Sequence, residues 1–265
     1  MKAKNTMLVL LNTLSFLIAL FINYIVQTHT LTDIAMSEVS HKYNTLFAPA
    51  DYAFLIWLVI YVMCACFIIY QWTIINKDVH HYIQRTGIWF TAVNLLNALW
   101  CYCWIHEWLG WCVIVMLLLL ISLTTLAIKL RLELDDEPVK TIFFVWWPIT
   151  FYLGRIITAT VACIASWLVY AGWSAINISQ STWAIVMIII ACLIYIFLIR
   201  KRNMREAAGV GIWAFIAIAI RQWNDHNNIA ITAVIASVIL LIMVARHGYK
   251  NSYYAPFNKI KRGEW

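Results

Sequence analysis

Residues 47–61 read FAPADYAFLIWLVIY, a polar loop marked by Pro49 that becomes an apolar helix without a break. Proline suits the first turn of a helix, because its fixed φ is helical and its missing N–H would have no partner there. Once the segment is helical, Phe54, Trp57 and Tyr61 lie at i, i+3 and i+7 and share one face. We therefore expect the loop to form a lid over the aromatic start of the helix. The alternative is that these rings only mark a membrane–water interface, where Trp and Tyr are common.

The composition is that of a membrane protein. The chain has 265 residues, of which 64% are hydrophobic and only 12% charged. A helix needs about 20 apolar residues to cross the hydrocarbon layer, and it must satisfy its own backbone there. The predicted fold class is therefore all-α, a polytopic membrane helix bundle of about eight transmembrane helices. Their expected ranges are roughly 7–27, 52–72, 86–105, 109–128, 143–171, 182–199, 207–223 and 228–246.

The basic residues alternate with the predicted helices. Lys and Arg precede the first helix and follow the second, fourth, sixth and eighth, whereas the loops at the other end carry only Lys42. The positive-inside rule places the basic loops in the cytoplasm. We therefore predict a multi-pass protein of the cell (plasma) membrane with both termini cytoplasmic. The net charge of +7 is expected to meet anionic lipid and not nucleic acid.

No metal or catalytic constellation is visible. All seven cysteines lie inside predicted helices without zinc-type spacing, so we interpret them as small apolar helix residues. We expect no catalytic residue, no metal ligand and no resident cofactor.

Amides in the third predicted helix indicate a polar surface inside the bundle. Asn94, Asn97 and Trp100 step at i, i+3 and i+6, and Trp104 lies seven residues beyond Asn97. Amides are costly in lipid, so they should face other helices or a cavity. Two interpretations stay open, hydrogen bonds between helices or the wall of a ligand cavity.

The fifth predicted helix carries a buried cation. Arg155 lies deep in its apolar run, where arginine costs at least ~2.5 kcal/mol even on the lenient insertion scale. We expect it to face the bundle interior, water or an anionic ligand, with snorkelling to an interface as the alternative. Pro148, near the start of the same run, should kink the helix.

Three further features carry weaker expectations. Gly209 and Gly211 permit close helix approach, and Arg221 is placed for ordinary snorkelling. The mixed-charge loop with acidic residues between positions 133 and 137 is expected to be solvated.

The string around Pro49 resembles the tryptophan-rich sensory protein family, relatives of the mitochondrial translocator protein, whose loop and second helix run roughly F-x-P-P-x-W-x-F-x-P-x-W-x-x-x-Y. Three departures mark a divergent, longer form. The second proline is Ala50, the first Trp is Tyr52, and one residue is missing between Phe54 and Trp57. The matching residues are Phe47, Pro49, Tyr52, Phe54, Trp57 and Tyr61.

Two further motifs are similar to those of this family. The N-x-x-W of Asn97 and Trp100 resembles its third-helix motif, which lines the ligand cavity. In the fifth helix the family pattern is roughly P-Y-x-x-W-x-x-x-A-x-x-x-N. Arg155 stands at its Trp position, and a cation there should favour carboxylate-bearing ligands. The resemblance covers about residues 7–175.

The resemblance implies a membrane protein of sensory or regulatory type that binds a tetrapyrrole or sterol-like molecule. A transporter of a small amphipathic or anionic substrate is the alternative. Light-dependent porphyrin breakdown in some relatives depends on a loop Trp that is Tyr52 here, so we expect no enzyme. The expected ligand-binding residues are Phe47, Pro49, Tyr52, Phe54, Trp57, Tyr61, Asn94, Asn97, Trp100, Trp104, Pro148, Tyr152 and Arg155.

The expected domain organisation has three parts. Residues 1–175 form a five-helix core, 176–247 contribute three additional transmembrane helices, and 248–265 are a basic cytoplasmic tail. The expected partners are the lipid bilayer and a hydrophobic small molecule, with porphyrin or haem as candidate ligands, and a homodimer is a further expectation.

Overall fold

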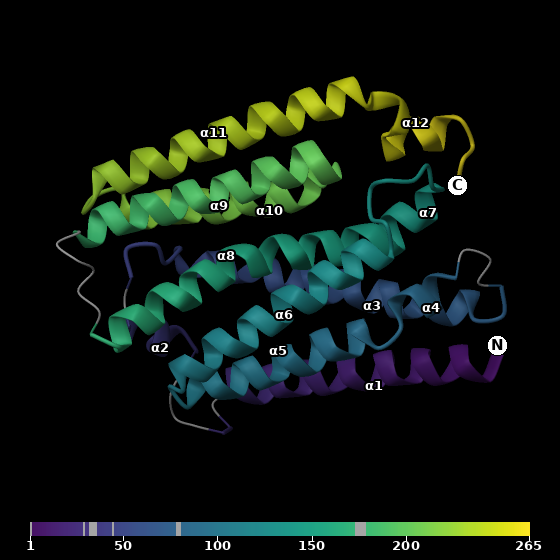
Figure 1. The fold of residues 1–265 in the computed structure, drawn as a ribbon, viewed down its shortest axis with the longest axis horizontal. Coiled ribbons are helices and arrows are strands. Elements are labelled where there is room, and N and C mark those ends of the chain that lie inside the picture. The colour runs from purple at the N-terminus through teal and green to yellow at the C-terminus, as the bar shows by residue number, and fades with distance from the viewer. Residues whose placement is uncertain (1, 29, 32–35, 44, 78–80, 173–178) are drawn as a thin grey trace.

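The computed structural model describes residues 2–28, 30–31, 36–43, 45–77, 81–172 and 179–265. In this part of the chain, long helices run side by side along one axis (Figure 1). Their ends agree with the predicted ranges to within a few residues. They are α1 (Lys2–Gln27), α3 (Ile56–Ile74), α5 (Trp89–Ile105), α6 (Leu109–Lys129), α8 (Trp147–Tyr170), α9 (Gln180–Arg202), α10 (Arg205–Gln222) and α11 (Asn227–Lys250).

Six spans in the described residues are long and apolar enough to cross a membrane: those of α1, α3, α6, α8, α9 and α11. The other two long helices fall short for local reasons. The helix α5 has 17 residues, and α10 has 18 residues with charges at both of its ends. Both run alongside the six, so the chain is a polytopic helical membrane bundle (Figure 1).

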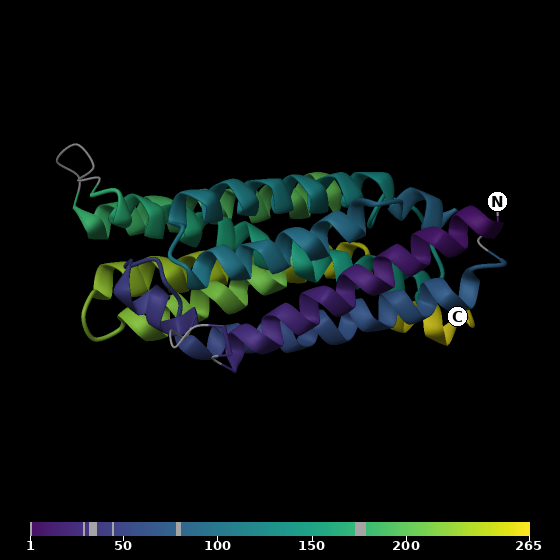
Figure 2. The same ribbon diagram turned by 90° about the horizontal axis from the view of Figure 1, so that it is seen from below.

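The short elements gather at the two ends of the bundle. The basic end carries both termini together with α4 (Tyr82–Thr86), α7 (Val139–Thr141), η3 (Ser252–Tyr254) and α12 (Pro256–Lys261) (Figures 1 and 2). The lid end carries α2 (Met36–Lys42) and the 3-10 helix η1 (Asp51–Leu55).

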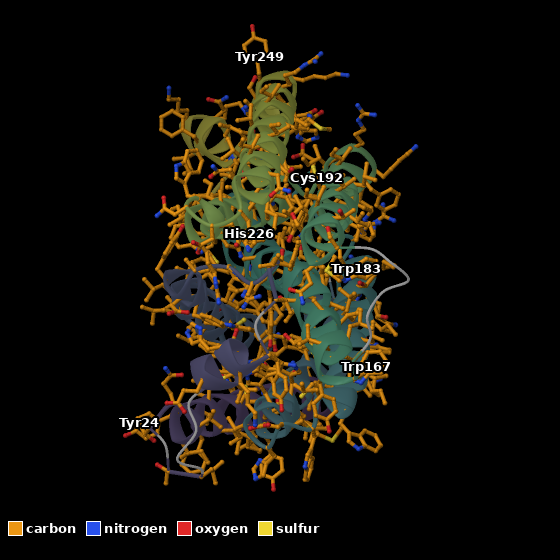
Figure 3. The ribbon with its side chains drawn as sticks, turned by 90° about the vertical axis from the view of Figure 1, so that its left-hand side faces the viewer. Tyr24, Trp167, Trp183, Cys192, His226 and Tyr249 are labelled. Atoms are coloured by element: carbon orange, nitrogen blue, oxygen red, sulfur yellow. The ribbon has the colours of Figure 1, made fainter. Side chains whose placement is uncertain are left out.

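The outside of the bundle is apolar. Leu58, Ile69, Leu193 and Ile235 each expose more than half of their surface. Seen from the lid end, Trp167 of α8 and Trp183 of α9 lie on one flank and Tyr24 of α1 on the other (Figure 3). Because large apolar groups cover the long flanks, the bilayer contacts these helices around the bundle.

The helix α8 lies at the centre and packs against α3, α6, α9 and α10. It approaches α10 closely at Gly154, where a side chain would lie 2.7 Å from the Ala207 carbonyl oxygen. The Tyr195 hydroxyl of α9 donates to the Gly154 carbonyl at 2.7 Å and lies 2.5 Å from the Thr158 hydroxyl. Gly211 of α10 makes room for the Tyr195 ring. The predicted close approach between helices is therefore confirmed at Gly211, where α10 meets α9.

At the start of α8 the structure has a π-helical turn where the sequence predicted a simple kink at Pro148. Residues Ile142–Trp146 form a π-helical turn, η2, in which the Trp147 N–H bonds the Ile142 carbonyl. Pro148 has no N–H and its ring would clash with the carbonyl four residues earlier. A widened turn just before proline relieves that clash while the helix continues.

The loop between α6 and α7 is only partly solvated: Arg131 and Asp136 are exposed, but other side chains are buried. Glu137 is only 8% exposed. The Arg131 guanidinium donates two 2.8 Å hydrogen bonds to Asp135, and Lys259 pairs with Asp136. The Lys259–Asp136 pair holds the carboxyl-terminal tail against the loop, because Lys259 belongs to α12, whereas the Arg131–Asp135 pair lies within the loop. The loop is therefore a docking surface for the tail.

We predict that Gly211→Ala destabilises the protein by about 1–3 kcal/mol, the usual cost of overpacking a core. The new methyl group would lie 2.5–2.7 Å from the Tyr195 ring and force it away from Gly154. Gly209→Ala is the matched control, because nothing lies within 4 Å of a side chain there. Thermal unfolding in detergent should show a lower midpoint for Gly211→Ala alone. Equal midpoints would contradict the role of Gly211.

Candidate functional site

The lid is held by α10. Here the lid means residues 45–55, which lie across the lid end ahead of α3. Trp213 Nε1 donates to the Ala53 carbonyl at 3.3 Å, and the Ala50 N–H donates to the Ala217 carbonyl at 3.1 Å. The lid is therefore positioned by a helix that lies outside the predicted five-helix core.

The end of α10 adds two further bonds. Arg221 Nη1 donates to the Pro49 carbonyl at 3.1 Å, and Gln222 Nε2 donates to the Leu46 carbonyl at 3.0 Å. The interpretation of Arg221 as a snorkelling side chain was incomplete, because its guanidinium also serves a backbone carbonyl of the lid. The sequence does not predict a role for Trp213 or Gln222. Periodicity within a helix carries no information about its contacts with a loop that is distant in the sequence.

A cavity of about 60 Å³ lies beneath the lid. Its walls come from α2, the lid, α5, α8 and α10. The lining residues are Ser40, Thr45, Ala48, Pro49, Ala53, Phe54, Trp100, Trp104, Arg155, Thr158, Ala159, Ala162, Cys163, Ser166, Val210, Trp213 and Ala214. Five of the expected ligand-binding residues are among them: Pro49, Phe54, Trp100, Trp104 and Arg155.

Arg155 is the charged group of this lining. Its guanidinium carbon lies 5.7 Å from the centre of the Phe54 ring and 5.5 Å from that of Trp57. Within the described residues it has no hydrogen-bond or ion-pair partner. The hydroxyl of Thr45, which is buried in the same lining, also lacks a partner. The cavity therefore holds a cation and a hydroxyl whose hydrogen-bonding capacity is unused.

Further aromatic rings pack against Trp57, one of the two rings that contact Arg155. Trp57 stacks on Tyr61 with ring centres 5.4 Å apart and meets the edge of Tyr152 at 5.5 Å. The expected face of Phe54, Trp57 and Tyr61 is therefore turned toward α8. Cation–π contacts of this kind contribute about 0.5–2 kcal/mol each and leave the N–H donors free for another partner.

Asn94 and Asn97 of α5 do not line the cavity. They lie behind the aromatic wall, which here means Trp57, Tyr61 and Tyr152. Asn97 accepts hydrogen bonds from Asn23 of α1 at 3.0 Å and from the Tyr61 hydroxyl at 3.4 Å. Asn94 donates to Ser15 of α1 at 3.2 Å. Both amides link helices, and Asn97 connects to the aromatic wall through Tyr61.

The remaining expected residues lie around the cavity or away from it. Phe47 is buried in the lid, and Tyr52 meets the edge of the Trp213 ring at 5.2 Å. Pro148 is buried near the basic-end start of α8. The structure thus places Phe47 and Tyr52 in the lid and Pro148 away from it.

At the lid end, polar contacts tie α2 and Tyr43 to α5 and to the turn that follows α5. Trp104 Nε1 donates to the Met36 carbonyl of α2 at 3.0 Å. Lys42 Nζ bonds both oxygens of Glu107 at 2.8 and 2.6 Å, and the Tyr43 hydroxyl donates to Glu107 at 2.5 Å. Hydrogen bonds from Lys42 and Tyr43 hold the pKa of the Glu107 carboxyl below its ordinary value of 4.5. A lowered pKa in the folded state means that the charged carboxylate stabilises the fold.

We predict that Glu107→Gln lowers the thermal midpoint at neutral pH, because the charge that holds Lys42 and Tyr43 is lost. This contribution is fully present above pH 4.5 and disappears as the pH falls through the lowered pKa of Glu107. The midpoints of wild type and variant should therefore converge in acid. Asp225→Asn, an exposed carboxylate at the lid end, is the control and should leave the midpoint unchanged. A difference that grows in acid would contradict this role.

The chain matches one known family over residues 9–246, which is described as TSPO-like protein. This range includes α9, α10 and α11, the three helices beyond the five-helix resemblance. No curated protein and no solved structure matches the chain. In the described residues, no group of three His, Cys, Asp or Glu side chains is placed to hold a metal ion. Since the match includes part of every long helix and most of the 265 residues, the chain belongs to the TSPO-like protein family.

Proposed function

We propose that this protein is a membrane receptor of sensory or regulatory type that binds an amphipathic, anionic ligand beneath the lid. The observation that carries the proposal is the Arg155 guanidinium, which lines the cavity between two rings without a hydrogen bond among the described residues. A carboxylate can accept two parallel bonds from such a group, and a flat ring system can stack on the neighbouring aromatics.

The energetics favour an anionic guest. Arginine inside the membrane costs at least ~2.5 kcal/mol, and the two ring contacts, about 0.5–2 kcal/mol each, reduce that cost without satisfying the guanidinium N–H donors. A charged hydrogen bond contributes about 1.5–3 kcal/mol, enough to complete the compensation. A tetrapyrrole with propionate groups therefore suits this lining better than a neutral sterol-like molecule.

The ligand must displace the lid. A cavity of about 60 Å³ is far smaller than the roughly 300–1,000 Å³ of typical ligand pockets. Opening breaks the four hydrogen bonds between the lid and α10, each with a net contribution of about 0.5–1.5 kcal/mol. A ligand that satisfies Arg155 can compensate for this loss, so binding and lid opening are coupled.

The positive-inside rule orients the proposed receptor in the cell (plasma) membrane. The basic end with both termini faces the cytoplasm, and the lid faces the outside. A homodimer stays a prediction. The proposal contains no catalytic step.

We predict that wild type binds protoporphyrin IX more tightly than its dimethyl ester, which lacks the two carboxylates. Arg155→Leu should abolish this preference and weaken binding of the diacid about tenfold or more, the loss expected for one charged hydrogen bond. Quenching of Trp fluorescence in detergent measures both affinities. Arg200→Gln, an exposed cation at the basic end, is the control and should behave as wild type.

Equal affinities for diacid and ester in wild type would overturn the assignment of Arg155 to an anionic ligand. The alternative of a transporter is separated by a second measurement. Sealed proteoliposomes should show saturable porphyrin binding without accumulation in the lumen, whereas a transporter of anionic substrates would accumulate it.

A further inference from the structure

A second cavity lies at the basic end, far from the lid. It has a volume of about 270 Å³ and lies between the loop that follows α6, the start of α10, the end of α11 and the tail. The lining residues are Glu133, Leu134, Asp135, Asp136, Glu137, Ile142, Trp146, Asn203, Arg205, His247, Asn251, Tyr254, Pro256 and Lys259.

The tail encloses this cavity through specific contacts. Lys259, only 3% exposed, pairs with Asp136 and donates to the Glu137 carbonyl at 2.9 Å. The Val139 N–H donates to the Glu264 carbonyl at 3.1 Å. Trp146, Ile142 and Pro256 add apolar wall. The cavity is therefore built by ordered side chains and backbone.

Among the described residues, the Glu133 carboxylate of this lining has no ion-pair partner. Asp135 is taken by Arg131, Asp136 by Lys259, and Arg205 donates to Glu206 at 2.8 Å. The Oε1 atom of Glu133 is buried and has no hydrogen-bond partner. Burial and the nearby Glu206 raise the pKa of the Glu133 carboxyl well above its ordinary value, and Arg205 opposes them.

His247 presents a second unused acceptor. The Asn251 amide nitrogen lies 3.1 Å from both Nε2 and the carbonyl of His247. The Asn203 amide nitrogen donates to the Glu133 carbonyl, so Asn203 Oδ1, 3.1 Å from Nε2, can only accept. Nε2 therefore carries the proton, and the Asn251 amide donates to the His247 carbonyl. The Nδ1 atom of His247 is then an acceptor, and it is buried without a partner. The indole N–H of Trp146, a residue that is 3% exposed, also lacks a partner.

We propose that this basic-end cavity binds a small organic cation, with an ammonium group for Glu133 and His247 and a ring bearing a hydrogen-bond acceptor for Trp146. An ammonium group has three donors and no acceptor, which matches two unused acceptors. The Trp146 and Tyr254 rings offer apolar and cation–π contact. The volume is close to the lower end of the range for small-molecule sites.

Three probes of one shape test the charge requirement. Tyramine is the cation, 4-(2-hydroxyethyl)phenol the neutral analogue, and 3-(4-hydroxyphenyl)propionate the anion. Isothermal titration of the full chain in detergent should show that tyramine binds wild type about tenfold or more tightly than either analogue. Glu133→Gln should weaken tyramine binding by a similar factor. Glu107→Gln, a carboxylate variant at the lid end, should leave it unchanged.

Arg155→Leu should also leave tyramine binding unchanged, so failure here is distinguishable from failure of the lid site. Tyramine binding of equal strength in Glu133→Gln, anion binding as tight as that of tyramine, or no tyramine binding to wild type would each overturn the proposal. If Glu133→Gln does not fold, the three-probe comparison on wild type and the His247→Phe variant decide by the same criteria.

Discussion

Tyr195 of α9 ties together three helices at the centre of the bundle. Its hydroxyl donates to the Gly154 carbonyl of α8 and pairs with Thr158 one turn further on, while its ring lies against Gly211 of α10. Lipid offers no hydrogen-bond partner, and apolar side chains gain little by leaving it, so close packing and such buried hydrogen bonds hold membrane helices together. The positions of α8 and α10 relative to each other depend on this contact.

The geometry of the lid cavity depends on this contact, because α8 and α10 both form its walls. Arg155 belongs to α8, one residue after Gly154, whereas Trp213, Arg221 and Gln222 belong to α10 and hold the lid. A shift of one helix along the other would move the guanidinium away from the lid. The family match, which runs through residue 246, includes both α8 and α10.

The two cavities carry unmatched groups of opposite charge at opposite ends. Arg155 lies beneath the lid with aromatic contacts alone, and Glu133 lies beneath the tail with a buried oxygen that has no partner. Uncompensated charges are costly when they are buried, so neutralisation or a ligand is the usual resolution. By contrast, other charged groups at the two ends are paired, such as Lys42 with Glu107 at the lid end and Lys259 with Asp136 at the basic end.

Hydropathy and charge by themselves determined the helical class, the helix ranges and the alternation of basic loops, because each depends only on local composition and on the thickness of the bilayer. The aromatic face of Phe54, Trp57 and Tyr61 followed in the same way from helical periodicity. The partners of these residues could not be predicted. Asn97 meets Asn23, which is 74 positions away. Only the tertiary structure decided that α10 holds the lid and that the tail encloses Glu133, because those contacts depend on shapes such as Tyr195 against Gly211, which leave no periodic trace in the chain.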